Sequence, residues 1–142
     1  MSTVVRPAAL DELPLLHAIR REVFVVGQGV PAEIEVDGRD ADCAHVLALV
    51  DGAPVGTARL REVDGHGKAE RVAVLESHRG QGLGVALMAA LEALARDAGH
   101  AELHLHAQWP VVPFYERLGY VGRGDPFDEA GIRHLAMGRH LR

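Results

Sequence analysis

The sequence predicts one α+β domain built on a mixed, mostly antiparallel central sheet flanked by helices. Predicted strands outnumber predicted helices, and the two kinds of element are interleaved in an order that favours one layered sheet. One long helical segment lies between two strand segments over residues 68–107, as in a right-handed parallel crossover. The 142 residues show no internal repeat and no linker. We therefore expect a single domain over residues 1–142.

The first half of the chain is expected to contain a strand, a helix, a loop and a hairpin. The helix begins at Asp11, a suitable N-cap, and continues to about Phe24 with apolar residues at helical spacing. The acidic, glycine-containing segment Gly27–Cys43 is expected to be a loop with one short helical turn at most. The dipeptide Asp51-Gly52 is typical of a hairpin turn. The strands are expected at Thr3–Arg6, Ala44–Val50 and Pro54–Arg61.

The second half is expected to contain a long helix between two strands and a short helix near its end. A flexible connection over Asp64–Gly67 leads into this half. Leucines at positions 83, 87, 91 and 94 form one face of the long helix, and Gly99 follows where a C-terminal cap belongs. A short helix over Pro110–Leu118 ends before Gly119. The strands are expected at Lys68–Leu75, Ala101–Ala107, near Tyr120-Val121, and at Ile132–Arg139.

Composition and charge exclude several classes of function. Hydrophobic residues make up 48% of the chain and charged residues 25%, the ordinary balance of a soluble globular protein. No stretch approaches the roughly 20 apolar residues that span a bilayer, and the N-terminus lacks the pattern of a targeting segment. The net charge of -5 argues against nucleic-acid binding. Cys43 is the single cysteine and cannot form an internal disulfide, so we expect a cytoplasmic protein with an inert thiol.

The most informative stretch is a glycine-rich loop between a strand and the long helix. The strand ends with Val72-Ala73-Val74, and the loop is Arg79-Gly80-Gln81-Gly82-Leu83-Gly84. Glycines let backbone N–H groups approach a ligand closely, and the helix that follows adds unpaired N–H groups and the positive end of its dipole. Together these features predict a site for a phosphate-type anion.

Three phosphate-binding patterns compete for this loop. A P-loop requires Lys and then Ser or Thr after its last glycine, but Gly84 is followed by Val85. A dinucleotide fingerprint that starts at Gly80 would need a glycine where Val85 stands, so it fails as well. The third pattern, R/Q-x-x-G-x-G/A, is satisfied by Arg79, Gly82 and Gly84, and its amides hold the pyrophosphate of coenzyme A. The remaining alternative is that the glycines merely permit a tight turn.

Other stretches of the chain carry a family resemblance. The strand, the glycine loop and the long helix, followed by Phe114–Tyr120, resemble the acetyl-CoA site and the later helix–turn–strand segment of the GCN5-related N-acetyltransferase (GNAT) superfamily. The resemblance covers nearly the whole chain, although Gly27 stands where its ElaA/YjcF-like bacterial branch would have Glu. The stretches similar to that branch are Arg21–Val25, Val36–Asp40, His104–Gln108 and Ala130–His134.

The resemblance implies the GNAT, or acyl-CoA N-acyltransferase, fold and an acetyl-CoA-dependent N-acetyltransferase. The acceptor would be the primary amine of a small molecule, which attacks the thioester directly. By analogy with the family we also expect a homodimer. In this family the strand before the loop bulges and splays from its neighbour, and its free backbone groups bind the pantetheine. The residues expected to bind the coenzyme are Val72, Ala73, Val74, Arg79, Gly80, Gln81, Gly82, Leu83, Gly84, Val85 and Gln108.

Tyr115 is the leading catalytic candidate, because the matching tyrosine of the family lies beside the coenzyme's sulfur. A phenol has a pKa of about 10 and a thiol one of about 8.5, so the phenol stays protonated while the thiolate forms. The alternative for Tyr115 is a half-buried aromatic that packs the helix. The proton acceptor is less defined: Glu70, on the strand before the loop, is the first candidate. His45, His134 and a chain of waters are the alternatives.

Several features are open to more than one interpretation. His104 and His106 lie two apart on a strand, but no third ligand at a suitable spacing supports a metal site. The acidic residues of the segment 27–43 either attract a cationic amine or form a solvated loop. These acidic residues are Glu33, Glu35, Asp37, Asp40 and Asp42.

Two rival classes of function are a non-catalytic acyl-CoA-binding module and, less well supported, a nucleotide-dependent oxidoreductase.

Overall fold

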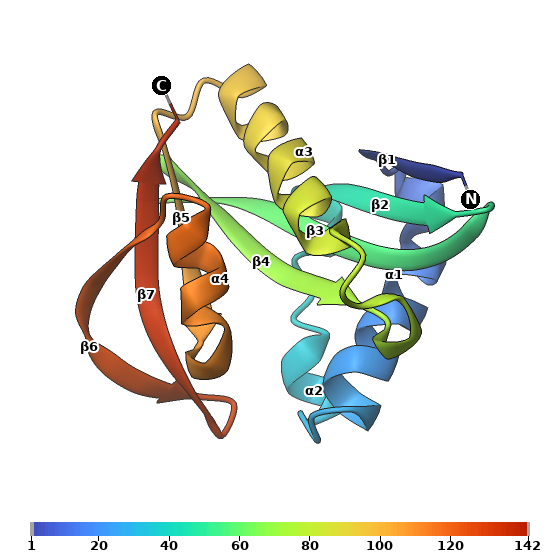
Figure 1. Ribbon diagram of the computed structural model, residues 1–142, viewed down its shortest axis with the longest axis horizontal. Coiled ribbons are helices and arrows are strands. Elements are labelled where there is room, and N and C mark those ends of the chain that lie inside the picture. Colours follow the sequence, from blue (N-terminus) through green and yellow to red (C-terminus); the bar gives the residue numbers. More distant parts are fainter. Residues whose placement is uncertain (1, 142) are drawn as a thin grey trace.

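The computed structural model describes residues 2–141, and within them seven strands form one sheet in the order β1-β2-β3-β4-β5-β7-β6 (Figure 1). Strands β4 and β5 pair in parallel, and all other neighbouring strands of these residues are antiparallel. The predicted mixed, mostly antiparallel sheet with one parallel crossover is therefore confirmed. The strands are β1 (Thr3–Pro7), β2 (Ala44–Val50), β3 (Ala53–Val63), β4 (His66–Val74), β5 (Glu102–Gln108), β6 (Val121–Glu129) and β7 (Ile132–His140).

Four α-helices flank the sheet in the described part of the chain, and none of them is long and apolar enough to cross a membrane. The first was predicted to extend to about Phe24, but its α-helical part ends at Arg20 and continues as a π-helical turn over Arg21–Val26. β-Branched valines at the end of this segment crowd a regular α-helix, which is consistent with the change from α-helical to π-helical hydrogen bonding. The helices are α1 (Leu13–Arg20), α2 (Ala32–Glu35), α3 (Leu83–Asp97) and α4 (Val112–Arg117).

Different helices cover the two faces of the sheet (Figure 1). On β2, Ala48 packs in the same cluster as Leu87 and Leu91 of α3, whereas the neighbouring Leu47 packs against Leu16 of α1. Successive side chains of a strand point to opposite faces, so α3 and α1 lie on opposite sides of the sheet. Burial of each of these leucines stabilises the fold by about 1.5–3 kcal/mol.

Two tight turns shape the central hairpins. Asp51 and Gly52 have φ values of 50° and 83°, and Asp64 and Gly65 have values of 51° and 82°. Positive φ at both central residues is the geometry of the two-residue turns that match the twist of a hairpin. The first hairpin was predicted. The second is tighter than the predicted connection Asp64–Gly67, because β4 already begins at His66.

Strand β4 contains a one-residue bulge at Arg71. Thr57 of β3 pairs with Ala73, but Arg59, two residues later, pairs with Glu70, so β4 contains one extra residue here. Arg71 has a φ of 55°, which is rare for a residue other than glycine and is typical of a bulge. The extra residue reverses which side chains of β4 face each side of the sheet.

Beyond the bulge, β4 also separates from β5. Their parallel pairing is limited to Gly67–Ala69 and Leu103–Leu105, although β5 continues to Gln108. The backbone groups on the inner edge of β4 beyond this pairing therefore have no partner on β5. This is the bulged and splayed strand that the family resemblance implied.

Candidate functional site

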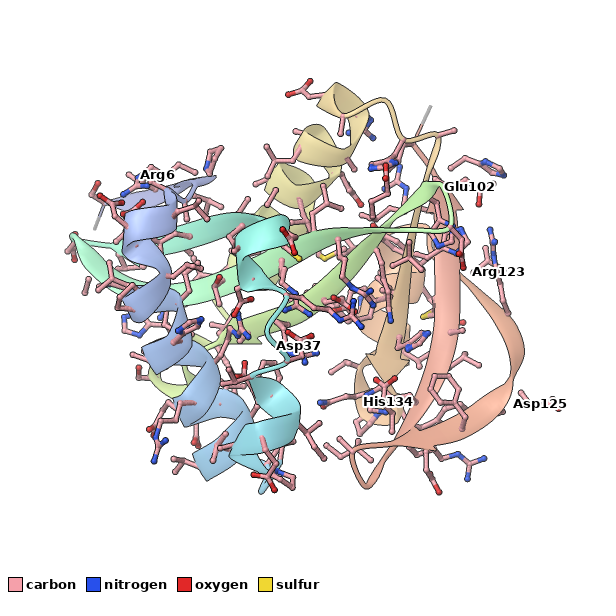
Figure 2. The ribbon with its side chains drawn as sticks, turned by 180° about the vertical axis from the view of Figure 1, so that it is seen from behind. Arg6, Asp37, Glu102, Arg123, Asp125 and His134 are labelled. Atoms are coloured by element: carbon pink, nitrogen blue, oxygen red, sulfur yellow. The ribbon has the colours of Figure 1, made fainter. Side chains whose placement is uncertain are left out.

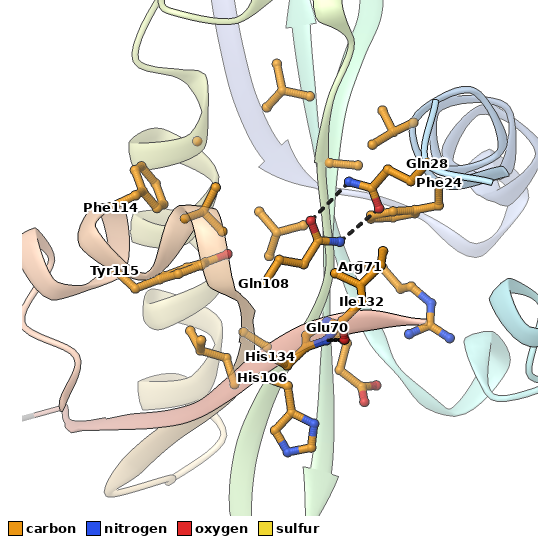
Figure 3. Close-up of a pocket in the computed structure, with 18 of the residues that line it drawn as sticks. Phe24, Gln28, Glu70, Arg71, His106, Gln108, Phe114, Tyr115, Ile132 and His134 are labelled. Atoms are coloured by element: carbon orange, nitrogen blue, oxygen red, sulfur yellow. Dashed lines mark hydrogen bonds between the residues drawn. The ribbon is translucent and has the colours of Figure 1, made fainter. Parts of the chain in front are cut away.

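A cleft of about 810 Å³ lies where β4 and β5 separate (Figure 3). Its walls come from β4, the start of α3, the end of β5, α4, β7 and the segment around α2. The structure brings together almost all residues that the sequence predicted for the site, with Gln81 outside the lining. The predicted residues that line the cleft are Glu70, Val72, Ala73, Val74, Arg79, Gly80, Gly82, Leu83, Gly84, Val85, Gln108 and Tyr115.

The glycine loop presents backbone rather than side chains to one end of this cleft. Gly80 and Gly82 have φ values of 78° and 79°, in the left-handed region that favours glycine. Gly82 is also the N-cap of α3 and supplies no side-chain hydrogen bond to the helix. The first amides of α3 therefore remain available to a ligand, at the positive end of the helix dipole.

Two further residues hold the loop in place. The Arg79 Nε donates a hydrogen bond to the Val74 carbonyl at 3.0 Å, which ties the loop to the end of β4. A Cβ atom on Gly84 would lie 3.2 Å from the Phe114 ring, so glycine here lets α3 approach α4 closely. These two contacts give Arg79 and Gly84 of the motif a structural role that does not depend on a ligand.

Tyr115 extends from α4 toward the cleft (Figure 3). Its side chain packs edge-on against Phe114 and Tyr120, with ring centroids 5.0 and 5.9 Å away. The residue is only 8% exposed, and burial raises the pKa of its phenol to about 12. Tyr115 therefore stays protonated across the neutral range and can act as a proton donor in the cleft.

Glu70 lies in the cleft wall, but three cationic side chains hold it. Its carboxylate is 2.7 Å from Arg59 Nη2, 3.0 Å from Arg61 Nε and 3.2 Å from Lys68 Nζ. Burial alone would raise the pKa of Glu70, but the hydrogen bonds from Arg61 and Arg59 outweigh it and lower the pKa to about 2. A carboxylate with such a low pKa is a weak general base near neutral pH. This environment argues against the predicted role of Glu70 as proton acceptor.

The structure separates the two histidines that the sequence offered as alternative bases. His45 is buried beneath α1, where its Nε2 lies 2.9 Å from the Asp40 carbonyl oxygen, and burial lowers its pKa. It is not among the residues that line the cleft. His134 does line the cleft, and its Nδ1 donates a hydrogen bond to the Ile132 carbonyl at 2.7 Å. Only His134 is thus placed to contact a ligand there.

The acidic segment 27–43 neutralises buried arginines. Arg20 and Arg59 are each 1% exposed. Arg20 pairs with Glu35 and with Asp40, the latter at 2.8 Å. Arg59 pairs with Asp37 at 2.8 Å and with Asp40 at 3.0 Å. Glu35 and Asp40 are therefore buried ion-pair partners of arginines and not solvated loop residues.

The ion pairs between the buried arginines and their carboxylates, here called the buried network, predict a loss of stability in acid. Hydrogen bonds from arginines lower the pKa of Asp37, and for Asp40 they outweigh a burial effect that would raise it; the pKa of Glu70 falls to about 2. A carboxyl with a lowered folded-state pKa stabilises the fold above its unfolded pKa, and this contribution disappears as the pH falls toward the folded value. Below about pH 4 the free energy of unfolding should drop by roughly 1.4 kcal/mol per pH unit for each group. Urea unfolding between pH 7 and pH 3 measures this free energy. An unchanged midpoint would contradict the stabilising role of these ion pairs.

Sequence reasoning missed a contact that spans the cleft. Gln28 and Gln108 exchange two hydrogen bonds of 3.1 and 2.8 Å (Figure 3). Arg71, at the bulge, donates to the Ile34 and Glu35 carbonyls at 3.3 and 3.2 Å. Both contacts connect the segment around α2 to the central strands. No periodicity or motif marks partners so distant along the chain.

The histidines considered as metal ligands bond to carboxylates instead. His104 Nε2 is 2.7 Å from Glu102, and His106 Nδ1 is 3.0 Å from Glu129. Within residues 2–141, no group of three His, Cys, Asp or Glu side chains is arranged to hold a metal ion. Burial raises the pKa of the Cys43 thiol, which disfavours the reactive thiolate.

Comparison with known proteins agrees with this geometry. Residues 17–141 match the family described as acetyltransferase (GNAT) domain. The uncharacterized N-acetyltransferase YjcF of Bacillus subtilis is 46% identical over 128 residues, which cover 89% of this chain and 91% of YjcF. An acyl-CoA N-acyltransferase from Pseudomonas aeruginosa has a similar crystal structure, with a TM-score of 0.85, 35% identity and coverage of 97% and 99%. Escherichia coli ElaA follows with a TM-score of 0.82, 27% identity and coverage of 97% and 99%. The chain therefore belongs to the GNAT family of acetyltransferases, in the branch that contains YjcF and ElaA.

Proposed function

We propose that this enzyme transfers the acetyl group of acetyl-CoA to the primary amine of a small molecule. One observation carries the proposal: a single cleft contains both the open N-terminus of α3 and the protonated side chain of Tyr115. The first feature suits the pyrophosphate of the coenzyme, and the second suits its departing sulfur. Release of free thiol from acetyl-CoA in the presence of a panel of primary amines tests the activity.

The residues of the cleft fit the coenzyme. A Cβ atom on Gly80 or on Gly82 would meet no described atom within 4 Å, so the space above the loop is open to a ligand. The unpaired inner edge of β4 offers the backbone groups of Val72, Ala73 and Val74 to the pantetheine. Gln108, at the end of β5, lies on the opposite wall. Acetyl-CoA supplies an activated acyl group, and the protein holds it in reach of the amine.

The chemistry then requires two proton transfers. The amine nitrogen forms a bond to the thioester carbonyl carbon, and the carbon–sulfur bond breaks. Tyr115, which its raised pKa keeps protonated, gives its phenolic proton to the departing thiolate. Glu70 was predicted to take the proton of the amine. Its ion pairs favour instead a structural role, in which it neutralises Arg59 and Arg61.

Replacing Gly82 with alanine should weaken acetyl-CoA binding. Alanine in the left-handed conformation costs about 1–2 kcal/mol, and the loop can avoid this cost only by moving its amides away from the pyrophosphate. Gly99→Ala is the matched control, because Gly99 has a φ of 85° just beyond the other end of α3, outside the cleft. Both variants should lose similar stability on thermal unfolding. Calorimetric titration should show a weaker acetyl-CoA affinity for Gly82→Ala alone, and equal affinities would contradict the proposed pyrophosphate site.

A further inference from the structure

His134 lines the cleft from β7. It lies on β7 directly opposite Gln108 of β5, and directly paired residues project from the same face of a sheet. That face is the one opposite α3, because the alternate residues Leu105 and Ala107 of β5 pack into the α3 core. His134 thus lines the cleft from the side opposite the helix that binds the coenzyme (Figures 2 and 3).

The hydrogen bonds of His134 define which ring nitrogen is free. Nδ1 lies 2.7 Å from the Ile132 carbonyl oxygen, and because a carbonyl can only accept, Nδ1 must carry the hydrogen. In the neutral ring the lone pair is then on Nε2, which has no hydrogen-bond partner among the residues that the structure describes. Phe127 stacks on the ring, with centroids 6.0 Å apart, and limits its rotation. The side chain is therefore a pre-oriented proton acceptor.

A carboxylate stands beside this acceptor nitrogen. Glu129 Oε2 lies 3.8 Å from His134 Nε2, while its Oε1 is 3.0 Å from His106 Nδ1. The hydrogen bond with His106 lowers the pKa of Glu129, so this group remains charged near neutral pH. A negative charge at this distance stabilises the imidazolium that forms when Nε2 takes up a proton.

The other titratable groups of the cleft are less suited to accept a proton. Glu70 is held by Arg59, Arg61 and Lys68, and Tyr115 keeps its proton. Charged and titratable groups of three strands line the same cleft as His134: Glu129 of β6, His106 of β5, and Lys68 and Glu70 of β4. Among them, Glu129 is the one that lies within 4 Å of Nε2 as an ion-pair partner.

We propose that His134 is the general base, with Nε2 accepting the proton that the acceptor amine loses, and that Glu129 is a positioning residue for the imidazolium. The inference rests on the proposed function. The amine nitrogen bonds to the carbonyl carbon, the carbon–sulfur bond breaks, and the amine proton moves to Nε2. The sulfur receives the Tyr115 proton, and solvent water returns one proton from the imidazolium to the tyrosinate. No oxidant, reductant or further reactant is required.

The variant His134→Asn separates the base from the structural contact, because its amide nitrogen can still donate to the Ile132 carbonyl. It should lower kcat by about 10²-fold or more and abolish the rise of kcat/KM on the acidic side of the pH profile. Acetyl-CoA affinity should not change, and added imidazole should restore part of the rate. His104→Gln is the matched control, since His104 lies 2.7 Å from a carboxylate oxygen of Glu102 but outside the cleft.

Glu129→Gln should keep the rise in the pH profile but shift it to lower pH, because loss of the negative charge destabilises the imidazolium. A purely structural role for Glu129 would leave the position of the rise unchanged.

A measurement that needs no turnover tests the protonation of His134 independently of the proposed function. Nitrogen-15 NMR of the wild-type enzyme should show the neutral His134 ring protonated at Nδ1, and protonation at Nε2 would overturn the assignment. An inactive wild-type enzyme with every amine would refute the proposed function, while the NMR result would still decide the tautomer. A folded His134→Asn variant with the wild-type pH profile and kcat would overturn the assignment of His134 as the general base.

Discussion

Replacing Tyr115 with phenylalanine is expected to lower kcat by about 10²-fold or more. In the proposed mechanism the phenol is the proton donor, and burial keeps it protonated by raising its pKa to about 12. Phenylalanine preserves the edge-on packing against Phe114 and Tyr120, so the shape of the cleft is retained. The acetyl-CoA affinity should therefore remain within about threefold of the wild-type value. Steady-state kinetics and calorimetric titration measure the two quantities separately.

Tyr120→Phe provides the control for this variant. The Tyr120 hydroxyl donates to Glu92 at 2.7 Å and lies outside the cleft. Its loss leaves a buried acceptor with one hydrogen bond fewer and should reduce stability by about 1–3 kcal/mol, with little effect on kcat. If Tyr115→Phe turned over as fast as the wild type, the phenol would be an aromatic packing residue and not the acid.

Arg59→Ala is expected to be the most destabilising substitution in the buried network, at about 3–5 kcal/mol. The guanidinium is 1% exposed and contacts the carboxylates of Asp37, Asp40 and Glu70 at 2.7–3.0 Å. Removing it leaves these three groups close together without their shared cation. The segment around α2, which lines one wall of the cleft, should then detach from β3. Urea unfolding followed by circular dichroism gives the free energy.

Arg39→Ala is the matched control, because the Arg39 side chain is 57% exposed and reaches Asp37 only at 3.9 Å. Such an exposed pair contributes about 0–1 kcal/mol. Equal unfolding midpoints for the two variants would show that the acidic segment does not depend on Arg59.

The parts of the fold that the sequence predicted are those encoded over short distances. The hairpin at Asp51-Gly52, the leucine face of α3 and the glycine loop each depend on neighbours within one or two turns of chain. The loop Arg79–Gly84 is of this kind: the residue that follows Gly84 and the spacing of its glycines exclude two other phosphate motifs. Strand boundaries were less accurate, as at β4, because they depend on pairing with other strands.

The parts that could not be predicted depend on partners far apart in the sequence. Asp37 and Asp40 look like solvated loop residues until Arg59, on another element, is found between them. The bulge at Arg71 has no glycine to mark it, and only the family resemblance suggested it. Glu70 seemed a suitable base from its position on the strand. Its cationic neighbours, which are adjacent only in the folded sheet, change that assessment.

The most direct test is to incubate the wild-type enzyme with acetyl-CoA and a panel of small primary amines. Free thiol and acetylated amine are then quantified together. The account predicts that thiol appears in equal amount with the acetylated product of at least one amine, and that Tyr115→Phe slows both together. Tight binding of acetyl-CoA with neither thiol nor product from any amine would contradict it. That result would identify the chain as a non-catalytic acyl-CoA-binding module.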